Sequence, residues 1–253
     1  MTTFQVELTV LAGLTGLIVG SFVNLVAIRL PKGESIAWDR SRADCCGTAL
    51  SARELVPVFS WLAQGGRCVH CRAKVTVRHP MVELTGAAIG VWAALISPTP
   101  SAAILTALFG WQLLLIALVD ADELWLPDRL TLPLLASGLI AATSLPDRTL
   151  VDALLGAVFG FASLWMLAMV YRHLRAKDGL GGGDPILFGA IGAWVGWIGL
   201  PSVLLWACAA GLGWVAARAL AQRPLGRDEP LPFGPFMVVG GWLTWLYGPI
   251  GIG

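Results

Sequence analysis

The chain has 253 residues, of which 57% are apolar and only 13% charged, and it contains 12 Trp residues. This composition excludes an ordinary water-soluble domain and indicates that the chain folds in a lipid bilayer. The formal net charge of +1 gives no reason to expect a nucleic acid as a partner.

Apolar stretches of about 20 residues, the length needed to cross roughly 30 Å of hydrocarbon, recur along the whole chain. We therefore expect an all-α polytopic membrane protein with about eight transmembrane helices. The first stretch follows the sequence MTTFQVE, which has an acid and no basic residue, so it is expected to be a retained helix and not a cleaved signal. The eight stretches are residues 6–28, 81–97, 101–119, 130–146, 150–170, 182–199, 201–217 and 232–250.

The basic residues predict the orientation of these helices. If the N-terminus lies outside, 16 of the 17 Lys and Arg residues fall on one face of the membrane and only Arg148 lies on the other. Because cytoplasmic loops carry an excess of Lys and Arg, the charged face is predicted to be cytoplasmic.

Residues 31–80 form the one sizeable polar segment, and they hold four of the five Cys residues. A segment of this size buries little core, and small domains commonly depend on a metal or a docking surface. The predicted organisation is a first transmembrane helix over residues 1–30, a small cytoplasmic Cys-containing domain over 31–80, and a transmembrane bundle over 81–253.

Acidic residues at membrane edges are the first candidates for chemistry, since they are costly there. Asp120 closes the third stretch, with Asp122, Glu123 and Asp128 after it, and Asp184 opens the sixth stretch behind a run of Gly. Both places lie at the predicted cytoplasmic face, so Asp120 and Asp184 can meet and share a proton as in aspartic proteases. Three other readings stay open: solvated loop acids, a helix cap at Asp184, and an ion relay in a transporter.

Glycines recur at helical spacing in the sixth stretch, at Gly189, Gly192, Gly196 and Gly199. Such a stripe lets neighbouring backbones approach closely, and we interpret it as a packing feature.

Several segments resemble, in order, those of the type IV prepilin peptidases, which are bifunctional leader peptidases and N-methyltransferases. They are GSFVNLVAIRLP (20–31), RHPMVE (78–83), VDADELWLPDRLTLP (119–133), GLGGGDPILFGAIGAW (179–194) and PFGPF (232–236). The resemblance implies that Asp120 and Asp184 are the catalytic pair, supported by Gly181, Gly183 and Asp128.

The resemblance also implies the substrates and the location. Prepilins or pseudopilins of a type IV pilus or a type II secretion system would be cut after a Gly, at the cytoplasmic face of the bacterial inner membrane. The new amino terminus would then be methylated with S-adenosylmethionine.

The chain departs from the family pattern in two places. Ile186 stands where a Lys is usual, which removes a cation near the acid pair. The second cysteine knuckle, CVHC at 68–71, is intact, whereas the first reads RADCCG, with Ala43 at its first ligand position. The expected zinc ligands are therefore Cys45, Cys46, Cys68 and Cys71, with Asp44 or His70 as substitutes. Cys208 is expected to be a packing residue.

The sequence is less explicit about methyl transfer, because no nucleotide-binding glycine fingerprint follows a predicted strand. GGRC at 65–68 resembles a family element associated with methylation, which points to Gly66. Glu83 either belongs to the same site or anchors its helix at the membrane interface. The expected function is thus prepilin cleavage with methylation; a peptidase without methyltransferase activity and an ion-coupled transporter remain as alternatives.

Overall fold

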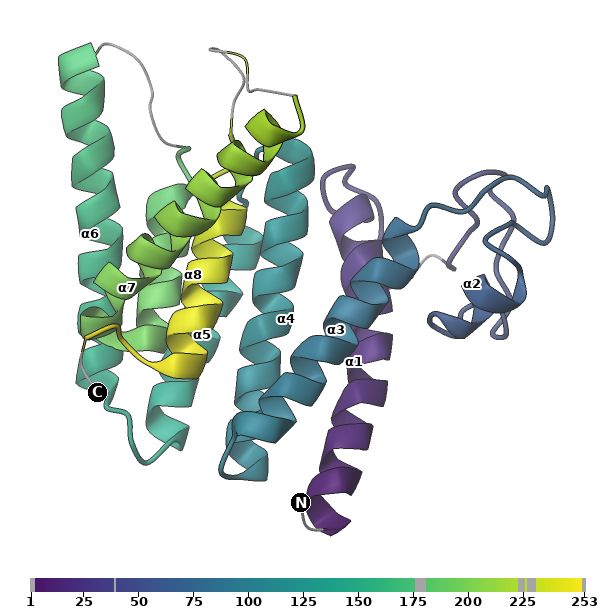
Figure 1. Ribbon diagram of the computed structural model, residues 1–253, viewed down its shortest axis with the longest axis horizontal. Helices are drawn as coiled ribbons and strands as arrows, with labels where there is room; N and C mark the ends of the chain where they lie inside the picture. Colours follow the sequence, from purple (N-terminus) through teal and green to yellow (C-terminus); the bar gives the residue numbers. More distant parts are fainter. Residues whose placement is uncertain (1–2, 39, 176–180, 223–225, 227–230, 252–253) are drawn as a thin grey trace. The chain divides into compact units, whose positions relative to one another are not determined.

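The computed structural model describes residues 3–38, 40–175, 181–222, 226 and 231–251. Parts of the predicted cytoplasmic loops 171–181 and 218–231 therefore lie outside the described residues. The described part of the chain contains eight α-helices and no β-strand (Figure 1). The helices are α1 (Thr3–Arg29), α2 (Phe59–Ala63), α3 (Arg78–Ile96), α4 (Pro100–Glu123), α5 (Asp128–Ser144), α6 (Leu150–Arg175), α7 (Asp184–Leu220) and α8 (Gly234–Tyr247).

The prediction of an all-helical membrane protein is confirmed in outline. Among the described residues, α1, α3, α4, α6 and α7 are long and apolar enough to cross a bilayer. The stretches predicted at 130–146 and 232–250 correspond to the shorter helices α5 and α8, of 17 and 14 residues. The number of eight transmembrane helices remains a prediction.

The chain divides into two compact units, residues 1–111 and 112–253, with the boundary inside α4. In the first unit, α1 and α3 pack against each other through two pairs of glycines spaced four residues apart. A Cβ atom on Gly16 would lie 2.3 Å from the carbonyl oxygen of Gly86, and one on Gly90 would lie 2.3 Å from that of Ala12. Only residues without a side chain allow this approach, as is typical of helix pairs in membranes.

The Cys-containing segment lies between α1 and α3 in the sequence and is mostly irregular. Its regular elements are α2 and two isolated antiparallel bridges, Arg42 with Ala49 and Arg67 with Lys74. Each bridge closes a tight loop that carries two of the four cysteines. The backbone alone therefore brings the two members of each Cys pair close together, without the help of a metal ion.

In the second unit, α6 and α7 make a similar glycine contact. A Cβ on Gly156 would lie 2.1 Å from the carbonyl oxygen of Gly192, and Gly160 lies against Phe188 and Gly189. The packing role predicted for Gly189 and Gly192 agrees with these contacts.

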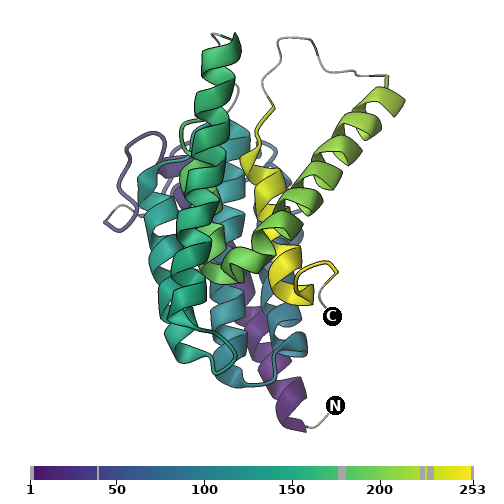
Figure 2. The same cartoon turned by 90° about the vertical axis from the view of Figure 1, so that its left-hand side faces the viewer.

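Gly196 has a different role from the other glycines of its stripe. Its backbone angles, φ 75° and ψ 169°, break α7 into two helical halves. Figure 2 shows the second half turning at this point and leaning away from α6. The two stretches predicted at 182–199 and 201–217 are therefore the two halves of α7, and the break lies four residues before the predicted boundary.

Arg148 contacts the backbone of α7 two residues before this break. Its guanidinium donates a hydrogen bond to the carbonyl oxygen of Trp194 and lies 4.2 Å from the centre of the Trp245 ring. The Trp194 indole in turn donates to the carbonyl oxygen of Leu134 at 2.9 Å. An unsatisfied backbone carbonyl is costly in an apolar region, so the hydrogen bond from Arg148 is expected to stabilise the chain next to the break.

Candidate functional site

Asp120 and Asp184 lie at helix ends in the second unit, and both are buried, with 5% of each residue exposed. Asp120 is in the last turn of α4, and Asp184 is the first residue of α7. The charge of Asp120 acts on Asp184, so the two carboxyl groups interact electrostatically. Two buried acids whose charges interact can divide their roles, with one protonated and the other ionised.

Each carboxyl group accepts a hydrogen bond from a backbone N–H. Gly234, the first residue of α8, donates to Oδ2 of Asp120 at 3.0 Å, and Gly181 donates to Oδ2 of Asp184 at 2.8 Å. These donors fix the orientation of both side chains. The hydrogen bonds compensate for part of the cost of burying polar groups.

The loop after Asp120 packs against the glycines before Asp184. A Cβ on Gly183 would lie 2.5 Å from the Cβ of Leu126, so only glycine fits there. Asp128 is the first residue of α5 and is exposed. The structure thus brings Gly181 and Gly183 to the acid pair, and leaves Asp128 at the surface of the same unit.

The four cysteines of the first unit form a cluster. The sulfur atoms of Cys45, Cys46, Cys68 and Cys71 all lie within 4.8 Å of one another. A tetrahedral zinc ion with bonds of about 2.3 Å would separate its sulfur ligands by about 3.8 Å, so this donor set fits zinc with small adjustments. The adjacent Cys45 and Cys46 point into one site despite the altered first knuckle.

Asp44 and His70, the two residues expected as substitute metal ligands, each contact another side chain. Oδ2 of Asp44 lies 3.0 Å from Nε2 of His79, and Nε2 of His70 lies 3.0 Å from Oε1 of Glu54. The His79 contact lowers the pKa of Asp44. Neither residue is needed to complete the ligand set, since four sulfur atoms already supply it.

Hydrogen bonds shift the pKa values of Cys45 and Cys68 in opposite directions. Contacts with the backbone of Cys71 and His70 lower the pKa of the Cys68 thiol to about 7. Hydrogen bonds with Cys71 and Cys68 raise the pKa of Cys45 to about 12. Cys68 therefore loses its proton more readily than Cys45.

Gly66 and Glu83 lie in the same unit as the cysteine cluster. Gly66 has a positive φ of 68°, and a Cβ on it would lie 2.9 Å from the indole of Trp61. Glu83, on α3, is 8% exposed, and its Oε2 accepts a hydrogen bond of 2.6 Å from the backbone N–H of Val58. Val58 has a φ of 61°, which is unusual for a β-branched residue, so Glu83 holds a strained turn in place.

Sequence reasoning missed two groups of contacts. Gly234 belongs to the segment PFGPF, and Asn24 and His79 belong to the segments GSFVN and RHP. All three segments had been identified as resembling family motifs, but no role had been derived for these residues. The motif match was the signal that could have identified them.

Two family models match the chain. The model of the bacterial peptidase A24 N-terminal domain matches residues 14–96, and that of the type IV leader peptidase family matches residues 107–216. No solved structure matches the chain.

Curated proteins named prepilin leader peptidase/N-methyltransferase are similar over nearly the full chain. One from Burkholderia pseudomallei is 40% identical, over 92% of this chain and 83% of that protein. One from Pseudomonas aeruginosa is 36% identical, over 93% and 89%, and one from Dichelobacter nodosus is 35% identical, over 93% and 90%.

Proposed function

Because the chain belongs to the type IV leader peptidase family, we propose that it is a membrane-bound aspartyl peptidase that removes the basic leader of prepilins or pseudopilins. The observation that carries this proposal is the pair of buried acids, Asp120 and Asp184. Each accepts a hydrogen bond from a backbone N–H, and their charges interact. The substrate class is that of the relatives' names.

The proposed reaction uses one carboxylate and one carboxylic acid. The carboxylate takes a proton from a water molecule as the water oxygen attacks the scissile carbonyl carbon, and the acid donates a hydrogen bond to the carbonyl oxygen. Collapse of the tetrahedral intermediate breaks the C–N bond, and the leaving amine takes a proton from the pair. Burial of both side chains strengthens these interactions.

The glycines before Asp184 have a proposed role in binding the substrate backbone. Gly181 and Gly183 leave no side chain between a bound peptide and Asp184, and Gly182 has no atom within 4 Å of the position of a Cβ. The exposed Asp128 would attract the basic leader.

The proposed location is the bacterial inner membrane, with the active site at the cytoplasmic face. The support is the distribution of Lys and Arg in the sequence, where Arg148 is the single exception. The five apolar helices support a multi-pass membrane protein.

We further propose methylation of the new amino terminus with S-adenosylmethionine, in a site that includes Gly66 and Glu83. The names of the relatives include this activity. Cys45, Cys46, Cys68 and Cys71 would hold a zinc ion whose contribution is to cross-link the irregular segment between α1 and α3.

Cleavage of a prepilin by the purified protein tests the proposal. Asp120→Asn and Asp184→Asn keep the shape of the side chain and remove its ability to exchange a proton, so each is expected to reduce the cleavage rate at least about a hundredfold. Asp122→Asn, at an exposed position, is the matched control. If both variants cut at the parent rate, the acid pair is not catalytic.

Mass spectrometry of a co-expressed pilin separates the alternatives. A cleaved and methylated amino terminus supports both activities, and a cleaved but unmethylated one indicates a peptidase only. An uncleaved pilin in the presence of the parent protein would contradict the peptidase proposal and favour the ion-coupled transporter.

A further inference from the structure

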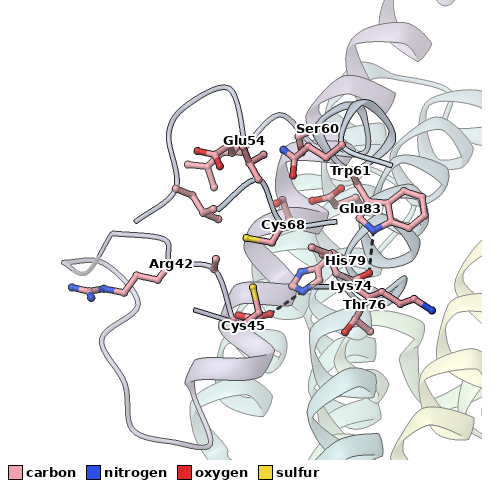
Figure 3. A pocket seen from close by; sticks show the side chains of 18 residues that line it. Arg42, Cys45, Glu54, Ser60, Trp61, Cys68, Lys74, Thr76, His79 and Glu83 are labelled. Atoms are coloured by element: carbon pink, nitrogen blue, oxygen red, sulfur yellow. Dashed lines mark hydrogen bonds and ion pairs between the residues drawn. The ribbon is translucent and has the colours of Figure 1, made fainter. Parts of the chain in front are cut away.

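A cavity lies beside the cysteine cluster in the first unit, between the irregular segment and the cytoplasmic ends predicted for α1 and α3. Its volume is about 180 Å³, and it is open to solvent on one side. Figure 3 shows Cys45, Cys68, His79 and Glu83 around it. Its charged lining consists of three carboxylates, Asp44, Glu54 and Glu83, against Arg42 and Lys74, so the cavity favours a cationic ligand.

Hydrogen bonds fix the state of the one histidine in this lining. Arg78 Nε donates to Oδ1 of Asn24 at 3.1 Å, which orients the Asn24 amide so that its nitrogen faces Nδ1 of His79 at 2.8 Å. Nδ1 must therefore accept, and Nε2 carries the proton and donates to Asp44 at 3.0 Å. Both nitrogens of His79 are engaged, so His79 is not available to take a proton from a ligand.

The three carboxylates of the lining also differ in their hydrogen bonds. Glu54 has both oxygens engaged, since Oε2 accepts from the N–H and hydroxyl of Ser51 and Oε1 contacts His70. Asp44 uses Oδ2 for His79, and its Oδ1 is open, but this residue is exposed. Glu83 uses Oε2 for the Val58 N–H, and its Oε1 has no hydrogen-bond partner among the described residues. Glu83 is therefore the one buried acid of this lining, and it has an oxygen free to meet a ligand.

Trp61 and Gly66 shape one wall of the cavity. The Trp61 indole donates to the carbonyl oxygen of Val75 at 3.3 Å, which fixes the ring, and Gly66 lies against the ring. A fixed aromatic face attracts cations and stacks with flat ring systems. A side chain at position 66 would push the Trp61 ring out of place. Gly66 therefore affects the shape of the cavity.

Resting on the methyl transfer of the proposed function, we propose that this cavity binds the sulfonium methyl donor together with the amino terminus of the cleaved pilin, and that Glu83 accepts the proton of the reacting amine. The ligand class follows from the lining. A sulfonium and an ammonium are both cations, the cavity is rich in carboxylates, and the adenine of the donor would have an aromatic wall.

The chemistry balances without a further reagent. The ammonium group gives one proton to Glu83, and the resulting amine lone pair attacks the methyl carbon of the donor. The bond between this carbon and sulfur breaks, and its electron pair remains on sulfur as a thioether. The methylated product is first an ammonium ion. It then loses one proton to solvent, and Glu83 also releases to solvent the proton that it accepted.

The first experiment locates the donor in the full-length protein reconstituted in nanodiscs. A photoactivatable S-adenosylmethionine analogue is expected to label peptides within residues 42–83. Equilibrium dialysis with radiolabelled S-adenosylhomocysteine is expected to show at least about tenfold weaker binding for Ser60→Trp, which fills the cavity, and parent affinity for the exposed control Ser101→Trp. Zinc content verifies that the first unit is folded in both variants.

Labelling confined to residues 112–253, or unchanged binding by folded Ser60→Trp, would overturn the cavity assignment. A parent protein that cleaves pilin but neither binds the donor product nor methylates would instead refute the methyl transfer of the proposed function. The two failures are therefore distinguishable.

The second experiment tests Glu83. Glu83→Gln is expected to lower single-turnover methylation at pH 7 at least about a hundredfold and to make the rate rise more steeply with pH, as the amine with a pKa of about 7.7 loses its proton to solvent. Glu83→Asp, which keeps a carboxylate, is expected to recover part of the rate, and Glu34→Gln at an exposed position is the control. Equal rates and equal pH profiles in Glu83→Gln and the parent would refute the role of Glu83.

Discussion

The backbone N–H of Gly234 donates a hydrogen bond of 3.0 Å to Oδ2 of Asp120, across 114 positions of sequence. A Cβ atom on Gly234 would lie 2.5 Å from the same oxygen. The start of α8 therefore both orients Asp120 and leaves just enough room for its carboxyl group.

Gly234→Ala is expected to displace the Asp120 carboxyl group and to reduce prepilin cleavage by about a hundredfold, since shifts near 1 Å at a reacting group have effects of this size. Gly213→Ala, where a Cβ would have no atom within 4 Å, is the matched control. The measurement is the initial cleavage rate at saturating substrate. A Gly234→Ala protein that cuts like the control would show that this contact does not position Asp120.

Arg148→Met is expected to destabilise the second unit, because the carbonyl of Trp194 at the break of α7 loses its donor and the Trp245 ring loses its cation. The expected loss is about 1–3 kcal/mol, the cost of a buried acceptor left without its hydrogen bond. Thermal unfolding in detergent, monitored by circular dichroism, measures it. Arg129→Met, at an exposed position, should unfold at the parent temperature; equal shifts in both variants would argue against a specific role for Arg148.

Gly156→Ala is expected to separate α6 from α7, since the added Cβ would lie 2.1 Å from the carbonyl oxygen of Gly192. Overpacking of this kind costs about 1–3 kcal/mol. The same unfolding assay measures the effect, again with Gly213→Ala as the control. An unchanged melting temperature would mean that the two helices can separate without cost.

The purified protein is expected to carry one equivalent of zinc, and Cys45→Ala is expected to lose most of it, whereas Cys208→Ala, outside the cluster, keeps it. Metal analysis by mass spectrometry measures both. A zinc content below about a tenth of an equivalent in the parent, or equal contents in the two variants, would remove the site.

Zinc affinity is expected to fall as the pH is lowered, because each ligand thiol must lose a proton to bind. The pKa of Cys68 is lowered to about 7, so this thiol competes well with protons above pH 7 and is protonated below it. Competition with a chelator between about pH 6 and pH 8 measures the change. An affinity independent of pH over this range would contradict thiolate ligation.

The sequence was sufficient to predict the helical architecture and the residues that the structure gathers at the acid pair and the cysteine cluster. Long apolar stretches indicate membrane helices, and acids at their ends are rare enough to be conspicuous. Asp120 and Asp184 stand out in this way, and the four clustered cysteines stand out because they fall within one polar segment. The proposed roles of all six residues remain to be tested by substitution.

The contacts that the sequence did not predict depend on positions far apart in the chain. The break of α7 at Gly196 could not be distinguished from the other glycines of its stripe, since spacing alone does not reveal a positive φ. The hydrogen bonds of Asn24 with His79 and of Gly234 with Asp120 join different helices. Partners of this kind follow from packing, which a local pattern does not contain.

The glycine contacts between α1 and α3 affect how far the length of the irregular segment between these helices can change. Gly20 lies against the backbone of Glu83, so the two ends of the segment are held close together by the helices themselves. The entropy of loop closure is then set by this helix pair, and it grows only slowly with the length of the loop. Insertions at the exposed turn near Gly33 should therefore be tolerated without moving α1, α3 or the cluster that the loop encloses.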